Sequence, residues 1–504
     1  MNAFLHLTAL SLIPGAFLSA QDLPATERDR PNFVVILADD MAWDDLGPFG
    51  NKKVHTPNLD RLAAEGMCFD QAFLTISSCS PSRASILTGR YPHQTDAEQL
   101  HWPIPASQII FPQRLKLAGY FVGAAGKWHL GEAMRERFTV VREVDTSGFQ
   151  LPANAGADAR GNFVETATGD ARSGCADWVS LLRERDPSKP FLVWLAAVDP
   201  HRPYDEQISK QSHSPDEVVL PPYHPDTPLV RQDYARYYDE ITRLDRFVGA
   251  VLHELEAQKA ADNTIVVFLS DNGRPFPRDK TTLYDSGIRT PLIIRWPAVV
   301  KPGTRCNQLV SMIDLATTIL TLADLPVNRN YMGKDFTALL KGKNAAIRDT
   351  IFAEKNWHDY EDRARAVRDR RYKYIINHYS DLPATPPADA ARSDTFKEMQ
   401  RLRAEGTLPE VQSTCFTAPR PREELYDLAT DPHELNNLAR DPAHLDTLER
   451  LRAEYKHWRI RTREQIPKLR TPDEFDRVTG KPTPARIRPR WSKAKMIKEG
   501  VLLP

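Results

Sequence analysis

The stretch from Cys79 to Gly89, Cys-Ser-Pro-Ser-Arg-Ala-Ser-Ile-Leu-Thr-Gly, places a reactive thiol at the predicted start of a helix. Pro81 suits a first helical turn and Gly89 suits a C-terminal cap. The N–H groups and dipole of such a helix favour an anion beside Cys79, so we expect an acidified thiol. Arg83, four residues later, returns to the same helix face. The alternative is a buried structural cysteine, because a free Cys commonly behaves as a small core hydrophobe.

Two pairs of oxygen donors, Asp39-Asp40 and Asp271-Asn272, each follow a short apolar run directly. Carboxylate and amide oxygens are the ligands that Ca²⁺ and Mg²⁺ prefer. Taken alone, each pair is also typical of an ordinary turn. The His and Cys spacing of zinc sites is absent from the sequence. The sequence therefore indicates a hard divalent cation if these pairs meet.

Basic residues follow other apolar runs in the same way. Lys127 and His129 flank a Trp, and in an extended segment both side chains would point to one side. His201 lies in Asp-Pro-His-Arg-Pro, and Lys280 follows nine residues after Asp271. Any one of these residues alone is more often a surface residue. Their shared position after apolar runs is what makes them candidates for binding an anion.

The elements that must position these residues are buried strands predicted at 33–37, 121–125, 191–198 and 265–269. Helical patterns separate them, including a long amphipathic helix with apolar residues from Tyr234 to Leu255. We therefore predict a doubly wound α/β fold with a mixed, mostly parallel sheet. Ligands of such sheets bind beyond the carboxyl ends of the strands, where all the candidate residues lie.

A chain of 504 residues exceeds one hydrophobic core, so we expect a large and a smaller domain. We place a catalytic domain at 30–370, a C-terminal subdomain at 371–465 and a basic, proline-rich tail at 466–504. A Pro- and Ala-rich loop is expected at 382–390 and a helix at about 443–458. The 40 prolines exceed the usual share of about 5%, which indicates many fixed loops.

The charges balance, with 67 basic and 67 acidic residues, so no global field indicates a nucleic acid or membrane partner. Residues 1–20 resemble a secretory signal, which predicts export to the periplasm or the medium. No later run has the length of a membrane span. If Cys79 is catalytic, Cys68, Cys175, Cys306 and Cys415 remain, and they could form disulfides in three ways or stay as buried thiols.

The motif Cys-Ser-Pro-Ser-Arg with Leu-Thr-Gly, together with Gly-Lys-Trp-His-Leu-Gly at 126–131, resembles the formylglycine-dependent sulfatases of the alkaline phosphatase-like superfamily. Residues 424–428 and 431–438 are similar to the C-terminal α+β subdomain of that family, which carries an antiparallel sheet. The resemblance implies that a maturation enzyme oxidises the cysteine to formylglycine (3-oxoalanine). It also implies a bound cation, usually Ca²⁺ with Mg²⁺ as the alternative, held by Asp39, Asp40, Asp271, Asn272 and the modified Cys79.

The same resemblance implies a role for each catalytic residue. The hydrated aldehyde at position 79, activated by the metal and Asp271, attacks sulfur. Arg83 and Lys127 stabilise charge on the hydrate and the sulfate. His201 and Lys280 protonate the leaving atom, and His129 removes the proton that allows sulfate to be expelled.

Several details are similar to the N-sulfoglucosamine sulfohydrolases, or sulfamidases, within this family: Ser77-Ser78, Asp-Pro-His-Arg at 199–202 and Asn-Gly-x-Pro-Phe-Pro at 272–277. A sulfated saccharide is therefore the expected substrate, with N-sulfoglucosamine and O-sulfated sugars both open and exo action expected. Candidate sugar-binding residues are His93, Asp96, His101, Arg274, His358 and Asp359. The alternatives are a phosphate or phosphonate monoester hydrolase on the same fold, and a secreted glycan-binding protein with unmodified Cys79. The sequence does not indicate an oligomeric state.

Overall fold

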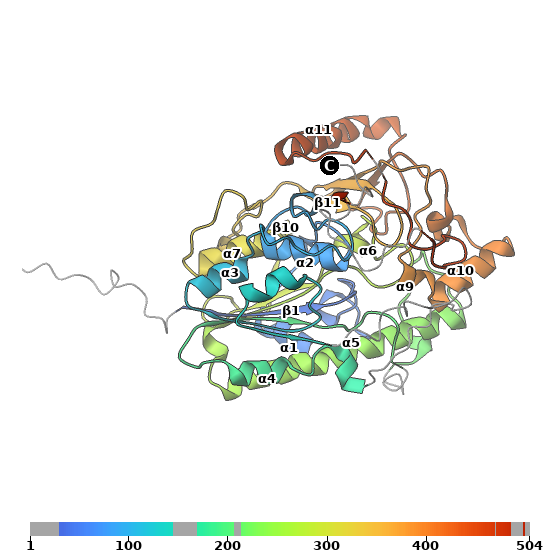
Figure 1. The fold of residues 1–504 in the computed structure, drawn as a ribbon. Coiled ribbons are helices and arrows are strands. Elements are labelled where there is room, and N and C mark those ends of the chain that lie inside the picture. Colours follow the sequence, from blue (N-terminus) through green and yellow to red (C-terminus); the bar gives the residue numbers. More distant parts are fainter. Residues whose placement is uncertain (1–29, 145–168, 206–212, 469, 485–496, 499–504) are drawn as a thin grey trace, which may run out of the picture.

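A central eight-stranded sheet organises the protein (Figure 1). The computed structural model describes residues 30–144, 169–205, 213–468, 470–484 and 497–498, so the expected signal segment at 1–20 lies outside the described residues. The strands lie in the order β5 (Val140–Glu143), β4 (Phe121–Gly126), β6 (Phe191–Ala196), β1 (Asn32–Ala38), β7 (Thr264–Ser270), β8 (Leu292–Arg295), β2 (Met67–Phe69) and β9 (Thr304–Cys306).

The first five strands of this order are mutually parallel, whereas β8 runs antiparallel to both β7 and β2. The predicted mixed, mostly parallel sheet is therefore confirmed. Because β4, β6, β1 and β7 point the same way, their carboxyl ends share one edge of the sheet. That edge carries the candidate residues.

Helices cover both faces of the sheet (Figure 1). α1 (Pro57–Glu65), α4 (Trp178–Glu184) and the long α5 (Pro228–Ala257) lie on one face, and α2 (Cys79–Thr88), α3 (Phe111–Leu117) and α7 (Asp314–Leu322) on the other. Each face of the sheet has its own hydrophobic core, and β1 contributes to both. Val34 and Ile36 belong to the first core, with α1, α4 and α5, and Phe33, Val35 and Leu37 belong to the second core, with α2, α3 and α7. Alternate residues of a strand point to opposite faces, so a strand buried on both sides is apolar throughout.

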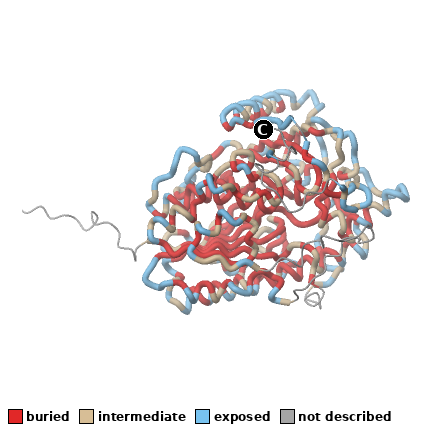
Figure 2. The backbone as a smooth tube through the Cα atoms, in the orientation of Figure 1, coloured by how far each residue is buried: buried red, intermediate tan, exposed pale blue. Residues whose placement is uncertain are grey.

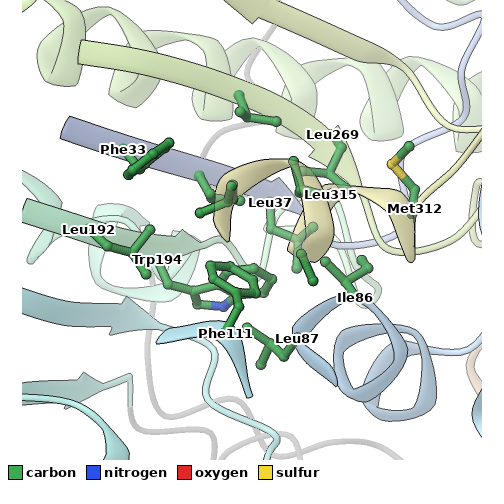
Figure 3. Close-up of a cluster of buried hydrophobic side chains, with 14 of the residues drawn as sticks. Phe33, Leu37, Ile86, Leu87, Phe111, Leu192, Trp194, Leu269, Met312 and Leu315 are labelled. Atoms are coloured by element: carbon green, nitrogen blue, oxygen red, sulfur yellow. The ribbon is translucent and has the colours of Figure 1, made fainter. Parts of the chain in front are cut away.

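The second core fixes α2 against the sheet. Figure 3 shows Leu37, Leu192 and Trp194 from the strands facing Ile86 and Leu87 of α2 and Leu315 of α7. All ten residues of α2 are buried, and Figure 2 shows buried backbone throughout the sheet beneath it. Gly89 ends the helix with φ 63°, a left-handed cap that glycine adopts without strain. The start of α2 is thereby held at the carboxyl edge.

A second, four-stranded antiparallel sheet follows, built from β11 (Ile351–Lys355), β12 (Ala364–Arg368), β13 (Tyr372–Asn377) and β14 (Glu423–Asp427). Helix α11 (Leu445–Thr462), two residues later at its start than expected, packs on it through Leu451 and Trp458. The expected boundary at 371 falls inside this sheet, between β12 and β13. The sheet thus begins earlier in the chain than the change in composition indicated.

Shorter elements complete the described chain: β3 (Ala72–Phe73) paired with β10 (Val310–Ser311), α6 (Asp285–Ile288), α8 (Thr337–Leu340), α9 (Ala388–Ala391) and α10 (Asp394–Ala404). The loop expected at 382–390 therefore ends in the short helix α9. Residues 470–484 of the expected tail contact the loop after β11, where Trp357 Nε1 donates to the Pro472 carbonyl (2.9 Å) and the Glu474 amide to the Asp359 carbonyl (2.7 Å).

Among the described residues, no helix combines the length and the apolar character needed to cross a membrane. All five cysteines are buried free thiols. Cys68 and Cys306 lie on neighbouring strands but belong to the cores on opposite faces of the sheet. The alternative of buried thiols therefore describes this structure, and none of the three disulfide patterns does.

Candidate active site

The two donor pairs meet at the carboxyl ends of β1 and β7. Asp39, Asp40, Asp271 and Asn272 are all fully buried. The Asp40 amide donates to Asp271 Oδ1 (3.3 Å), and Asn272 Nδ2 donates to Asp40 Oδ1. Asp40 has φ 74°, a conformation that Asp tolerates better than most residues and that ends β1 in a sharp turn. Two adjacent parallel strands thus bring four oxygen-bearing side chains together.

Cys79, the first residue of α2, lies beside these carboxylates. Its Sγ is 4.0 Å from Asp40 Oδ1, and ligand atoms of Asp39, Cys79 and Asp271 all lie within 4.8 Å of one another. Burial raises the pKa of the Cys79 thiol well above its usual value, although Lys127 and Lys280 act to lower it. The expectation of an acidified thiol is therefore wrong, because loss of hydration outweighs the helix terminus.

The donor set fits a divalent cation. Oδ1 of Asp39 and Oδ1 of Asn272 are buried without a hydrogen-bond partner in the described structure. Burial, with the nearby carboxylates, raises the pKa of Asp40 to about 8 and that of Asp271 to about 6. Crowded, buried carboxylates with unused oxygens are what a hard cation stabilises. Asp39, Asp40, Asp271 and Asn272 could hold Ca²⁺ or Mg²⁺.

Two cations lie on the α2 side of this cluster. Arg83 Nε donates to Asp271 Oδ2 (2.8 Å) and Nη1 to the Lys127 carbonyl (2.8 Å), with Nη2 at 3.7 Å from Asp39 Oδ1. The Lys127 ammonium pairs with Asp39 Oδ2. Burial opposes ionisation of Asp39, but Lys127, His201 and Arg83 together hold the pKa of its carboxyl below its ordinary value. Position i+4 of α2 thus returns Arg83 to the face that carries Cys79.

A second group of charges lies beside Asp40. Lys280 Nζ is 2.6 Å from Asp40 Oδ2 and 2.8 Å from Asp389 Oδ2. His201 Nε2 is 3.8 Å from Asp40 Oδ2 and 3.5 Å from Asp389 Oδ2. Burial and the charges of Lys280 and Lys127 lower the pKa of His201 to about 3. Lys280 is held charged, since Asp389 and Asp40 raise its pKa against the effect of burial.

The segment after β4 differs from the extended strand that would align Lys127 with His129. β4 ends at Gly126 with φ 100°, and His129 has φ 53°. His129 Nε2 is hydrogen-bonded to His101 Nδ1, and the His101 amide donates to Ser80 Oγ (2.7 Å), next to Cys79. A turn, and not strand alternation, therefore directs His129. It pairs His129 with His101, one of the candidate sugar-binding residues.

Two further candidates, His358 and Asp359, come from the loop after β11. Ser78 Oγ and His358 Nδ1 are hydrogen-bonded at 2.7 Å, next to Cys79. Asp359 Oδ2 accepts from the Ala388 amide at 2.9 Å. This loop therefore joins α2 to α9, and Asp359 supports the backbone next to Asp389.

The other three candidates have partners elsewhere. His93 bridges Glu354 (2.6 Å) and the Thr462 carbonyl (3.2 Å). Arg274 is 2% exposed and is enclosed by Asp44, by Asp45 at 3.2 Å and by the Tyr234 hydroxyl at 3.4 Å. Asp96, with φ 55°, acts electrostatically on Arg90. None of the described hydrogen bonds or ion pairs of His93 and Arg274 reaches the Cys79 cluster.

Asp389 is the site residue that sequence reasoning missed. It lies in α9, in the stretch expected to be a loop, and its side chain is 9% exposed. A single Asp in the Pro- and Ala-rich run Pro-Pro-Ala-Asp-Ala-Ala gives no signal of its own. Its closeness to Lys280, 109 residues earlier, appears only in the folded chain.

Two models of known protein families match the chain. The family model described as Sulfatase matches residues 31–325, and that described as N-sulphoglucosamine sulphohydrolase, C-terminal, matches residues 276–415. The second match spans both Lys280 and Asp389.

Two curated relatives match most of the chain. An ulvan-active sulfatase of Formosa agariphila is 32% identical over 449 residues, 85% of this chain and 75% of the relative. The human N-sulphoglucosamine sulphohydrolase is 30% identical over 476 residues, 87% of this chain and 91% of the relative.

Among solved structures, the phosphonate monoester hydrolase of Agrobacterium radiobacter has the same fold, with a TM-score of 0.66 at 18% identity over 88% of this chain and 97% of that one. The alkaline phosphatase-like fold is thereby confirmed. With the family model covering more than half of its length, the chain belongs to the sulfatase family, a family of sulfuric ester hydrolases.

Proposed function

We propose that this protein is an exported sulfatase that removes sulfate from saccharides through a formylglycine at position 79 and a divalent cation. The observation that carries the proposal is the position of Cys79, buried at the first turn of α2 and within 4.8 Å of the carboxylates of Asp39 and Asp271. Among the described residues, one oxygen of Asp39 has no hydrogen-bond partner. A free thiol with a raised pKa is a poor nucleophile at neutral pH. Conversion of Cys79 to an aldehyde removes that difficulty.

The proposed reaction needs two groups besides the unmodified chain, the formylglycine at position 79 and the divalent cation. A formylglycine at position 79 would supply, as its hydrate, the attacking oxygen and, as the aldehyde, a route for releasing sulfate. Asp39, Asp40, Asp271 and Asn272 would hold Ca²⁺ or Mg²⁺, which would supply positive charge to the site.

The residues of the chain bind the sulfate and move protons. Arg83 and Lys127 lie on the α2 side and stabilise negative charge there, since charge-assisted hydrogen bonds are strong in a buried site. Lys280 and His201 lie beside Asp40, and Lys280, which is held charged, donates a proton to the leaving atom. His129, held by His101, accepts a proton from position 79 when sulfate is released.

The proposed substrate is a sulfated saccharide, attacked from its end. Relatives named for N-sulphoglucosamine and for ulvan support a sugar sulfate but name different saccharides. The match of residues 276–415 to the sulphohydrolase C-terminal model favours N-sulfoglucosamine. His101 and His358, which contact residues next to Cys79, are the rim residues proposed to face the sugar.

A panel of sulfated monosaccharides and disaccharides tests the substrate. We expect release of sulfate from glucosamine N-sulfate. Release only from O-sulfated sugars would instead identify an O-sulfatase, and release from none would contradict the proposal. Turnover of an aryl phosphate and an aryl sulfate, measured side by side, distinguishes a sulfatase from a phosphate monoester hydrolase. The phosphate monoester hydrolase would turn over the aryl phosphate faster.

The modification and export have their own tests. Mass spectrometry of the tryptic peptide that contains position 79 should show the aldehyde or its hydrate, and an active enzyme with an intact thiol would contradict the mechanism. N-terminal analysis of protein from the periplasm or medium should show a mature chain that begins near Gln21. Active protein retained in the cytoplasm with Met1 would contradict export.

A further inference from the structure

Asp389 brings a carboxylate from outside the large sheet to Lys280, the proton donor of the proposed mechanism, and to His201. Its Oδ2 is 2.8 Å from Lys280 Nζ and 3.5 Å from His201 Nε2. The side chains of Asp389 and Lys280 are 9% and 1% exposed, so solvent screens their interaction little. A buried carboxylate between two basic groups fixes where those groups lie.

The position of Asp389 is itself fixed. Its Oδ1 accepts from the Ala390 amide (2.8 Å), and the Ala388 amide donates to Asp359 Oδ2 (2.9 Å). Asp359 is held in turn by the Glu474 amide, which donates to its carbonyl (2.7 Å). Two segments that are distant in the sequence, around Asp359 and Glu474, therefore hold α9 and this carboxylate in place.

The two carboxylates that contact Lys280 differ in their other contacts. Asp40 also accepts from Asn272 and lies 4.0 Å from the Cys79 sulfur, so it belongs to the proposed cation site. Among the described hydrogen bonds and ion pairs, those of Asp389 reach Lys280 and His201 and not the cation-binding residues. It is thus the carboxylate suited to hold Lys280 and His201 while Asp40 is engaged elsewhere.

We propose that Asp389 is a positioning residue that holds Lys280 and His201 against the leaving atom of the substrate. This inference rests on the proposed function. When the bond from sulfur to the leaving oxygen or nitrogen breaks, that atom keeps the electron pair and takes a proton from Lys280 Nζ, which solvent then restores. Asp389 exchanges no proton in this step.

The test compares two substrates that differ in their need for a proton: the sugar sulfate that the wild type hydrolyses fastest, and 4-nitrophenyl sulfate, whose phenolate leaves readily. General acid catalysis contributes about 10²–10⁴-fold, and less when the leaving group is acidic. We expect Asp389→Asn to lower kcat about 10- to 100-fold on the sugar sulfate and less than about threefold on the aryl ester. Asp389→Glu should recover part of the loss.

Asp394→Asn is the matched control, because Asp394 lies five residues later, is one-third exposed and pairs with Lys397 at 3.2 Å. The inhibition constant of inorganic sulfate, which has no leaving group, should change less than about threefold in Asp389→Asn, as should its unfolding temperature relative to the control.

Equal losses on both substrates, a large rise in the inhibition constant, or an unchanged kcat on the sugar would each overturn the inference. All three outcomes leave the proposed function standing. A wild-type enzyme that releases no sulfate from any ester would instead contradict the proposed function.

Discussion

The carboxyl edge of the large sheet and the C-terminal region (residues 351–484) contribute to the site in different ways. The sheet edge supplies Asp39, Asp40, Asp271 and Asn272 directly from the ends of adjacent strands. The C-terminal region supplies Asp389 through a four-residue helix that is held by a loop and by the segment after α11. Strand ends are positioned by the whole sheet, whereas Asp389 depends on a few specific contacts. Loss of a strand-end residue should therefore abolish turnover or nearly so, whereas loss of Asp389 should only reduce it.

The largest effect is expected at Cys79. Cys79→Ala and Cys79→Ser should both lose turnover, by a factor on the order of 10⁶ when the nucleophile of a covalent mechanism is removed. Ser is included because we expect the maturation enzyme to act on Cys. The measurement is sulfate release by each variant, after its unfolding temperature has shown that it is folded. Residual turnover near wild type in either variant would remove position 79 from the mechanism.

The next largest effect tests the cation site of the sheet edge. Chelation of divalent cations should abolish turnover, and Ca²⁺ or Mg²⁺ should restore it. Asp40→Asn should lower kcat by about 10²–10³-fold, because it removes a charge next to the attacking oxygen. Calcium content and turnover are measured together, with Asp381→Asn as a control, since Asp381 pairs with Arg470 in the C-terminal region. Full activity in metal-free protein would exclude a catalytic cation.

A smaller effect is expected where the C-terminal region holds α9. Asp359→Ala removes the acceptor of the Ala388 amide, and a lost helix cap costs about 1 kcal/mol. We expect kcat on the sugar sulfate to fall about five- to tenfold because Asp389 becomes less well placed. Asp359→Asn keeps an acceptor oxygen and should fall less. If Asp359→Ala raises KM and leaves kcat unchanged, Asp359 binds the sugar and does not position Asp389.

The same contrast explains what the sequence could predict. Asp39, Asp40 and Lys127 were predictable because each follows a buried parallel strand, and such strands end at one edge. Asp389 was not, because its neighbours carry no pattern and its contact with Lys280 depends on tertiary packing. His129 was assigned to the site, but its direction is set by a left-handed turn that strand alternation does not describe. The domain boundary was placed from composition, which does not show that β12 and β13 pair across it.

The smallest expected effect on turnover is at Glu361, which contrasts with Asp40 as a buried carboxyl of the C-terminal region. Burial, with Asp362 and Asp473 nearby, raises the pKa of Glu361 from 4.5 to about 8, and one oxygen lacks a hydrogen-bond partner among the described residues. Between these two values the folded protein holds a proton that the unfolded chain has lost. The free energy of unfolding contributed by Glu361 should therefore fall as pH rises through this window and level off above about 8.

Glu361→Gln should remove this fall without changing kcat. The variant should gain about 2 kcal/mol over the wild type at high pH, a figure that allows for partial solvent screening, and nothing at low pH. Denaturant unfolding at several pH values measures the difference, with the exposed Glu410→Gln as the control. If the free energies of unfolding of Glu361→Gln and wild type change with pH in parallel, the pKa of Glu361 is not raised and this prediction is wrong. A loss of turnover in this variant would show that the loop after β11 takes part in the reaction. The C-terminal region would then be as necessary for turnover as the sheet edge.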